Sequence, residues 1–195
     1  FLTETINEQQ KKIRKRSRPK ILLATNLDDA KALYEKYKDN LLGVISDVGF
    51  TVHKDEGPEK EKLDAGIDLV RHIRQDDIQM PILLQSSQGS VASQAQELGV
   101  GFLKKYSKTL MIQLSEYIKE EFGFGDFVFR DAERVEYGRA SNLKELEALV
   151  RTVPDDVLLK ATSKNMLSKW FYSRGLFTLG GKVKAVQESQ FGTTD

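Results

Sequence analysis

Three polar residues of complementary chemistry each follow a separate apolar stretch of the chain. They are an acid, an alcohol and an amine: Asp47, Ser86 and Lys105. If these stretches are parallel strands of one sheet, their carboxyl ends meet at a single edge, which brings the three side chains together. A carboxylate can attack a phosphoryl donor when a cation and a hydrogen-bond donor neutralise the charge on the transferring oxygens. The sequence therefore predicts that these three side chains converge on a phosphoryl group at this edge of the sheet.

The stretch before Asp47 is the clearest strand. Residues 41–45 are apolar apart from Gly43, and a nearly uninterrupted apolar run is typical of a parallel strand buried on both faces. Taken alone, Asp47 is explained equally well as a solvated acid at the end of a strand. The matching positions of Ser86 and Lys105 after their own strands favour the phosphorylation site.

Strands and helices alternate up to residue 122. Apolar runs predict strands at 20–24, 42–47, 81–85 and 102–104. Apolar residues at helical spacing predict helices between them, the first capped by Asn26. A further helix is expected after Ser107, with these residues facing inward: Leu110, Met111, Leu114, Tyr117 and Ile118. The alternation predicts an α/β fold with a parallel, doubly wound sheet and right-handed crossovers.

The pattern changes near residue 125. Short β-type runs at 127–130 and 134–137 predict a hairpin. Ser141 or Asn142 is expected to cap a helix, with Glu145 completing a capping box after Asn142, and Pro154 is expected in the first turn of another helix. Residues 193–195 are predicted to be a fraying end. The sequence therefore predicts two domains, an α/β domain over residues 1–124 and a small module of hairpin and helices over residues 125–195.

Composition and charge argue against several classes of function. The chain of 195 residues carries a formal net charge of +1, so bulk charge predicts no nucleic-acid partner. No apolar run approaches the roughly 20 residues that a membrane span needs, and cysteine is absent, which excludes disulfides and thiolate sites. We expect a cytoplasmic protein with no membrane partner. Residues 1–18 are predicted to form a helix that ends before Pro19 and that carries the basic run at 11–18. This run could bind nucleic acid or an acidic surface, but a solvated helix face or linker is favoured, because no aromatic residues interleave with it.

Up to residue 122 the chain resembles the receiver domain of two-component response regulators. The resemblance rests on residues 43–47, 65–66, 81–86 and 101–105 and on the spacing between these blocks. It implies a flavodoxin-like fold and Mg²⁺ as cofactor. It also implies a role for each site residue: Asp47 as phosphoryl acceptor and metal ligand, Gly49 as a metal ligand through its carbonyl, Ser86 and Lys105 as phosphate-binding residues, and Phe102 as the aromatic that moves with the hydroxyl.

The chain departs from the receiver pattern in two places. The family's acidic pair, which anchors Mg²⁺, follows its first strand, whereas Thr25 and Asn26 follow residues 20–24. Matching residues 20–24 to the second strand and residues 1–16 to the first helix restores the spacing. We therefore expect the first strand and its acids upstream of Phe1. In addition, Tyr106 replaces the proline that usually follows the lysine.

Four blocks also resemble the N-terminal regulatory part of bacterial phosphoenolpyruvate synthase and pyruvate, phosphate dikinase-like proteins. These blocks are residues 18–25, 40–47, 84–87 and 122–130. Residues 165–174 resemble a helix of the companion catalytic module of those proteins, with Met166 where histidine is usual. The resemblance implies a regulatory region joined to a catalytic one. The chain has no Gly-rich nucleotide loop and no nucleophile–base pair at recognisable spacing, so we do not expect it to be catalytic by itself.

Three functions follow from these observations. The favoured one is a signal-transduction receiver module, phosphorylated at Asp47 with Mg²⁺ by a histidine kinase or a small phosphodonor, that regulates an attached or partner catalytic region. The alternative is a pseudo-receiver that is not phosphorylated and acts as a scaffold for docking or for a homodimer. A DNA-binding response regulator ranks third, because residues 126–195 have no clear excess of basic residues.

Overall fold

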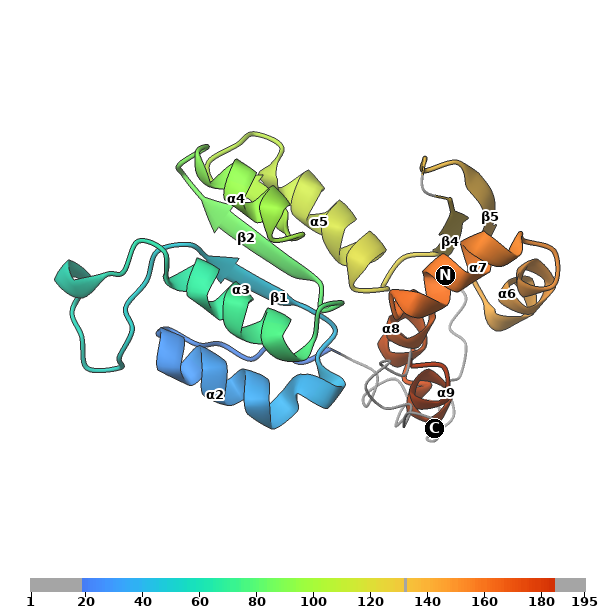
Figure 1. Cartoon of the computed structure of the whole chain (residues 1–195), viewed down its shortest axis with the longest axis horizontal. Helices are drawn as coiled ribbons and strands as arrows, with labels where there is room; N and C mark the ends of the chain where they lie inside the picture. The colour runs from blue at the N-terminus through green and yellow to red at the C-terminus, as the bar shows by residue number, and fades with distance from the viewer. Residues whose placement is uncertain (1–18, 132, 185–195) are drawn as a thin grey trace, which may run out of the picture. The chain divides into compact units, whose positions relative to one another are not determined.

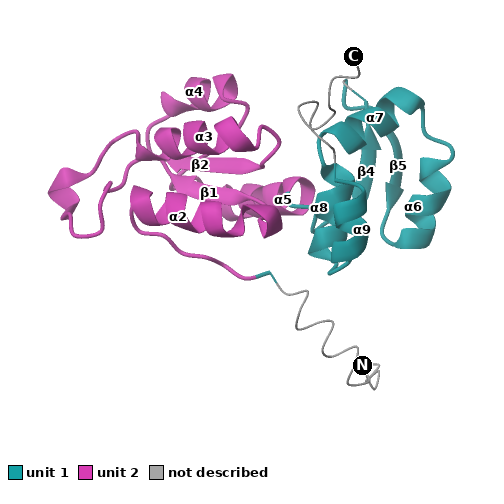
Figure 2. Cartoon of the chain, turned by 60° about the horizontal axis from the view of Figure 1, so that its bottom comes forward, with its two compact units in different colours: residues 1–19, 122–195 teal, residues 20–121 magenta. Residues whose placement is uncertain are grey.

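The described part of the chain, residues 19–131 and 133–184 of this computed structural model, forms two compact units. One unit is Lys20–Glu121, and the other begins at Phe122 (Figure 2). The predicted helix and basic run before residue 19 and the predicted end at 193–195 lie outside the described residues. In chain order, the main elements of the first unit are α2 (Leu27–Tyr37), β1 (Val44–Asp47), α3 (Ala65–Asp76), β2 (Ile82–Ser86), α4 (Val91–Glu97), β3 (Gly101–Lys104) and α5 (Leu110–Glu121).

The three strands form one parallel sheet in the order β1-β2-β3. Figure 1 shows β1 and β2 side by side in this sheet. Asp47 pairs with Gln85, and Ser86 pairs with Lys104, so all three strands end at the same edge. The predicted α/β architecture with a parallel sheet is therefore confirmed. The last three of the four predicted strands are present, with boundaries shifted by one or two residues.

The central strand β2 is buried on both faces. Ile82, Leu83 and Leu84 are fully buried, as expected for an apolar run inside a parallel sheet. Ile82 and Leu84 pack in one apolar cluster with residues of α2, α3 and α4. Leu83 points to the opposite face, because successive side chains alternate along a strand. On that face Tyr117 of α5 donates a hydrogen bond to the carbonyl oxygen of Ile82 at 2.8 Å.

The helix α2 begins at the predicted cap. The Asn26 side chain accepts a hydrogen bond from the Asp29 amide at 2.8 Å, and Asn26 is itself buried. The next two amides, of Leu27 and Asp28, donate to carbonyls of the loop at residues 51 and 52. The start of α2 is therefore fixed against this loop, which follows β1.

The prediction of a strand at residues 20–24 is wrong. This segment has no assigned strand, and Ile21 and Leu23 are 92% and 81% exposed. An apolar run has the propensity for a strand, but a strand also needs a hydrogen-bonded neighbour. Among the described residues, none supplies such a backbone partner to residues 20–24.

The prediction that the apolar side chains of α5 all face inward is also wrong. Met111 is 72% exposed, and no residue of α5 is fully buried. The helix has 12 residues and is about 18 Å long, whereas its contact strand β3 has four residues and spans about 13 Å. Part of α5 therefore extends beyond the strand that it covers.

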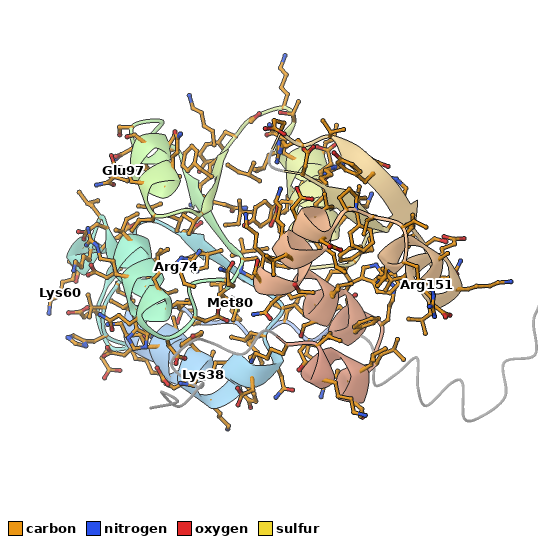
Figure 3. The ribbon with its side chains drawn as sticks, turned by 45° about the vertical axis from the view of Figure 1, so that its right-hand side comes forward. Lys38, Lys60, Arg74, Met80, Glu97 and Arg151 are labelled. Carbon is orange, nitrogen blue, oxygen red and sulfur yellow. The ribbon has the colours of Figure 1, made fainter. Side chains whose placement is uncertain are left out.

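Arg74 binds the backbone just before strands β2 and β3, at the end of the sheet opposite Asp47. Its guanidinium donates to the carbonyl oxygens of Asp77 at 3.1 Å and Met80 at 2.9 Å, just before β2 (Figure 3). It also donates to the carbonyls of Leu98 and Gly99, just before β3. These charge-assisted bonds hold the starts of the two strands in a fixed relation to α3.

The second unit is a hairpin followed by helices. Its elements are β4 (Phe127–Arg130), β5 (Glu136–Ala140), α6 (Leu143–Val150), α7 (Asp155–Ser163), α8 (Met166–Ser173) and α9 (Phe177–Lys182). The strands pair antiparallel, as predicted, with an irregularity in register between Phe129 and Arg130. Strand β5 begins two residues after its predicted start. The predicted capping of α6 is confirmed, since the Asn142 side chain accepts from the Glu145 amide at 3.0 Å.

The side chain of Arg174 binds residues 123–125, the segment that follows α5. Its guanidinium donates to the carbonyl oxygens of Gly123 at 2.9 Å and Gly125 at 2.8 Å, and it stacks 3.7 Å from the centroid of the Trp170 ring. The indole of Trp170 donates to the same Gly125 carbonyl at 3.1 Å. Gly123 has a φ of +79°, and a Cβ there would lie 2.9 Å from the backbone nitrogen of Trp170, so only glycine fits this contact.

Within the described residues, none of the helices combines the length and the apolar character that crossing a membrane requires.

Candidate functional site

The structure brings two of the predicted site residues into direct contact. The Nζ atom of Lys105 lies 2.9 Å from Oδ2 of Asp47, and both side chains are partly exposed to solvent. Asp47 is the last residue of β1, and Lys105 directly follows β3. The two strands are not neighbours, since β2 lies between them. An acid and an amine from separate strands therefore meet at the carboxyl edge of the sheet, where solvent can reach them.

Ser86 ends the intervening strand. Its backbone carbonyl accepts a hydrogen bond from the Lys105 amide at 2.9 Å, which fixes the position of the lysine relative to β2. Its hydroxyl oxygen accepts from the Gln88 amide at 3.1 Å. A serine hydroxyl carries one proton and two lone pairs, so this contact leaves the proton able to donate. Ser86 therefore stands at the same edge with its donor capacity intact.

The amino end of α3 packs closely behind Asp47. The Gly66 amide donates to the carbonyl oxygen of Val48 at 2.8 Å. A Cβ at Gly66 would lie 2.2 Å from the carbonyl oxygen of Asp47, so glycine is required for this approach. The amino end of a helix carries partial positive charge, which favours an anion near the end of β1.

Glu61 is a residue near the site that the sequence reasoning missed. A Cβ built on Gly49 would lie 2.5 Å from Oε1 of Glu61, so this carboxylate reaches the loop just after Asp47. Glu61 is brought there by an isolated antiparallel bridge between Phe50 and Lys62. The sequence signal was weak, because the bridge is formed by two single residues within a polar loop.

Phe102 and Tyr106 lie outside this contact. The half-buried Phe102 packs against the apolar cluster beneath α2, α3 and α4, and its backbone pairs with Leu84 inside the sheet. Tyr106 is exposed and has a φ of +62°, which turns the chain immediately after Lys105. The structure therefore brings Asp47, Lys105 and the end of β2 together, whereas the predicted switch aromatic lies within the fold.

Each of the two histidines pairs with a carboxylate. His53 pairs with Asp28 at 2.6 Å, and His72 pairs with Glu35 at 2.9 Å. Hydrogen bonding to Asp28 raises the pKa of His53 above its usual value, and the charge of Asp28 adds to this effect. Over residues 19–131 and 133–184, the structure contains no group of three or more His, Cys, Asp or Glu side chains arranged to hold a metal ion.

Comparison of the chain with protein-family models, with curated proteins and with solved structures gives no match. The geometry at the carboxyl edge of the sheet and the resemblance of the sequence motifs therefore carry the functional proposal.

Proposed function

We propose that the unit Lys20–Glu121 is a receiver-type signalling module in which Asp47 accepts a phosphoryl group. The observation that carries the proposal is the 2.9 Å ion pair between Asp47 and Lys105 at the carboxyl edge of the sheet, with Ser86 at the end of the strand between them. The parallel order β1-β2-β3, with helices between successive strands, is consistent with part of a doubly wound, flavodoxin-like sheet.

The residues supply each requirement of the transfer. A carboxylate oxygen of Asp47 attacks the phosphorus of an acyl phosphate or phosphoramidate, and an Asp–O–P bond forms. The bond from phosphorus to the donor breaks, and the leaving group takes its electron pair. The Lys105 ammonium then pairs with the phosphoryl oxygens in place of the free carboxylate, and the Ser86 hydroxyl can donate to them. The partly exposed position of Asp47 leaves room for the donor to approach.

Two oxygen groups near Asp47 are suitable ligands for Mg²⁺. Asp47 offers a carboxylate and Gly49 a backbone carbonyl, and both are hard oxygen ligands. Proteins commonly hold Mg²⁺ through one or two carboxylates together with phosphate oxygens. Glu61 places a second carboxylate beside Gly49. When bound, the ion would neutralise charge on the phosphoryl oxygens during transfer. Asp47 and Gly49 are the residues that would hold it.

The wider role follows from the resemblance of the sequence blocks. A module of this kind would control an attached or partner catalytic region resembling phosphoenolpyruvate synthase, and a histidine kinase or a small phosphodonor would supply the phosphoryl group. The unit that begins at Phe122 would connect the module to that region.

Incubation of the full chain with acetyl phosphate and Mg²⁺, followed by intact-mass measurement, tests the proposal. We expect a mass gain of one phosphoryl group in the native sequence and no gain in Asp47→Asn. No gain in a correctly folded native chain would leave the pseudo-receiver scaffold as the better account. An equal gain in Asp47→Asn would show that the acceptor is another residue.

A further inference from the structure

The second unit separates its charges along the chain and in space. Residues 126–160 contain eight acidic and six basic residues, whereas residues 161–184 contain five basic residues and no acidic one. The first range forms the hairpin, α6 and most of α7, and the second forms the end of α7 with α8 and α9. In Figure 2, α6 lies beside β5, and α8 and α9 lie on the other side of the hairpin. The acidic and basic parts of the unit therefore lie on different sides of it.

Three apolar side chains are exposed where the hairpin turn meets α7. Val135 is 54% exposed, Tyr137 is 45% exposed and Leu159 is 68% exposed. The first two belong to the turn and to β5, and Leu159 lies on α7. The turn is joined to α7 because Nζ of Lys160 donates a hydrogen bond to the carbonyl oxygen of Asp131. These contacts place the three apolar side chains around one junction.

Acidic residues surround this junction. The charge of Asp131 and its hydrogen bond to the phenol raise the pKa of Tyr137 above its usual value, and the charges of Asp156 and Glu133 add to this effect. Two basic residues accompany these acids: Arg134 and Lys160. We define the acidic patch by these residues: Val135, Tyr137, Leu159, Asp131, Glu133 and Asp156.

Two apolar side chains are exposed on α9. Phe177 is 50% exposed and Leu179 is 37% exposed. The ring centroid of Phe177 lies 6.1 Å from that of Tyr172 on α8. A Cβ at Gly180 would lie 3.1 Å from the carbonyl oxygen of Ser168, one turn earlier on α8, so α8 and α9 run antiparallel. The end of α9 therefore lies near the start of α8.

This arrangement brings exposed lysines together. Lys164 precedes α8, Lys182 ends α9 and Lys184 follows it, and all three residues are exposed. Arg174 adds positive charge, because its guanidinium is bound by carbonyl and hydroxyl oxygens, which leave that charge unneutralised. We define the basic patch by these residues: Phe177, Leu179, Lys164, Lys182 and Lys184.

We propose that the acidic patch of one copy of this chain docks on the basic patch of a second copy. Each patch has an apolar centre and a charged rim, as protein interfaces commonly do. The rims have opposite signs, so an acidic patch is attracted by a basic patch and repelled by another acidic one. Because the two patches are different surfaces, the association runs head to tail and can extend beyond two copies. It goes beyond the proposed function and does not depend on phosphorylation of Asp47.

A second copy is the one partner that accounts for both patches. A nucleic acid would pair with the lysines of the basic patch, but the acids around Tyr137 would repel it. A second copy offers an acidic surface to Lys182 and a basic surface to Asp156, and it covers the exposed apolar side chains of both patches. Small contacts with charged rims are typical of transient complexes. We therefore expect association that increases with protein concentration and weakens with salt.

Sedimentation velocity of the full chain over a range of protein concentrations, at about 50 and 500 mM salt, tests the proposal. Two variants each remove the charge of one patch without creating a new attractive pair, and all of the replaced side chains are exposed. The acidic-patch variant combines Glu133→Gln, Asp156→Asn and Leu159→Gln. The basic-patch variant combines Lys164→Gln, Lys182→Gln and Lys184→Gln.

We expect each variant alone to associate at least about tenfold more weakly than the native chain at low salt, because each lacks one of the two surfaces. The control combines Lys144→Gln and Glu147→Gln, which are exposed charges of α6 outside both patches, and it should associate like the native chain. The fluorescence of Trp170, which is buried in this unit, shows that each variant is folded.

A mixture of the two variants distinguishes head-to-tail docking from other modes of association. The acidic-patch variant keeps its basic patch, and the basic-patch variant keeps its acidic patch, so one contact can form between them and cannot be repeated. We expect an equimolar mixture to form heterodimers that grow no further, although neither variant associates by itself.

Three outcomes would overturn the proposal. A native chain that stays monomeric at low salt and at every concentration would show that the patches do not dock. Association of either variant as strong as that of the native chain would place the contact elsewhere. Without self-association, binding of an oligodeoxythymidylate of about 12 nucleotides that is lost only in the basic-patch variant would assign this patch to nucleic acid.

Discussion

Lys105 and Asp47 form an ion pair at 2.9 Å even though a complete strand, β2, separates the strands that carry them. Such a pair between partly exposed groups contributes little to stability, on the order of 0–1 kcal/mol. The phosphoryl transfer that we propose would give this ion pair a role other than stabilising the fold.

The first prediction concerns Lys105. In Lys105→Ala we expect the rate of phosphoryl transfer from acetyl phosphate to fall by about a hundredfold, because the charge on the transferring oxygens loses its positive partner. The free energy of unfolding should change by no more than about 1 kcal/mol. Lys104→Ala is the matched control, since Lys104 is the exposed neighbouring lysine. Intact-mass time courses measure the rate of phosphorylation in both variants. Equal rates would argue against a role for Lys105.

The second prediction concerns the contact of α3 with β1. In Gly66→Ala the new methyl group would lie 2.2 Å from the carbonyl oxygen of Asp47 and 3.0 Å from Cα of Val48, so the helix must move away from the strand. We expect a loss of about 1–3 kcal/mol in the free energy of unfolding, which overpacking typically costs, together with slower phosphorylation. Gly89→Ala is the control, because no atom lies within 4 Å of its added Cβ. A urea denaturation curve for Gly66→Ala that coincides with the control would contradict the contact.

The third prediction concerns Arg174. Its removal in Arg174→Ala breaks charge-assisted hydrogen bonds to Gly123 and Gly125 and the stacking on Trp170. We expect a loss of about 2–4 kcal/mol in the free energy of unfolding of the second unit. Arg174→Lys should recover only part of this, because an ammonium cannot donate in the same fork geometry.

Tryptophan fluorescence reports the unfolding of this unit specifically, since Trp170 is the chain's single tryptophan. The control is Arg151→Ala, which removes an exposed pair with Glu147 and should cost less than about 0.5 kcal/mol. If the two arginine variants unfold at the same urea concentration, the contacts of Arg174 do not stabilise the unit.

The fourth prediction is a pH dependence of the loop at residues 51–56. The pKa of His53 is raised because the Asp28 carboxylate hydrogen-bonds to its ring. A group whose pKa is higher in the folded state contributes its stabilisation fully below the unfolded value, about 6.5, and loses it as the pH rises through the folded value. We therefore expect the amides of this loop to be better protected from hydrogen exchange at pH 5.5, which is ~1 unit below the unfolded value, than at a pH where His53 is deprotonated. The exchange rates are corrected for the intrinsic effect of pH.

His53→Gln should remove this dependence, because glutamine carries no charge at either pH. An NMR titration of His53 in the native sequence should give a midpoint above that of an unstructured peptide. A midpoint at or below the peptide value would contradict the predicted pairing with Asp28.

The sheet and the site edge could be predicted from sequence to different degrees. Strand β2 was predictable because Ile82, Leu83 and Leu84 are consecutive apolar residues that are buried on both faces. The caps at Asn26 and Asn142 were predictable because capping is local chemistry. The contact of Asp47 with Lys105 followed from the rule that parallel strands end at one edge.

The sequence predictions were wrong or incomplete where the structure depends on more than the local propensity of the residues. Residues 20–24 have the composition of a strand, but pairing depends on a neighbour that the described residues do not provide. Met111 has the helical spacing of an inward-facing residue, but burial depends on how far β3 extends beneath α5. Glu61 reaches Gly49 through a bridge between two single residues, and no periodic pattern marks such a contact.

The most direct test of the account is to locate the phosphoryl group chemically. An aspartyl phosphate is an acyl phosphate, which borohydride reduces to the alcohol, so a phosphorylated aspartate becomes homoserine. After treatment of the full chain with acetyl phosphate and Mg²⁺, reduction and peptide mass mapping should place homoserine at position 47 and at no other aspartate. Unmodified Asp47, or homoserine at another position, would contradict the assignment of Asp47 as the phosphoryl acceptor.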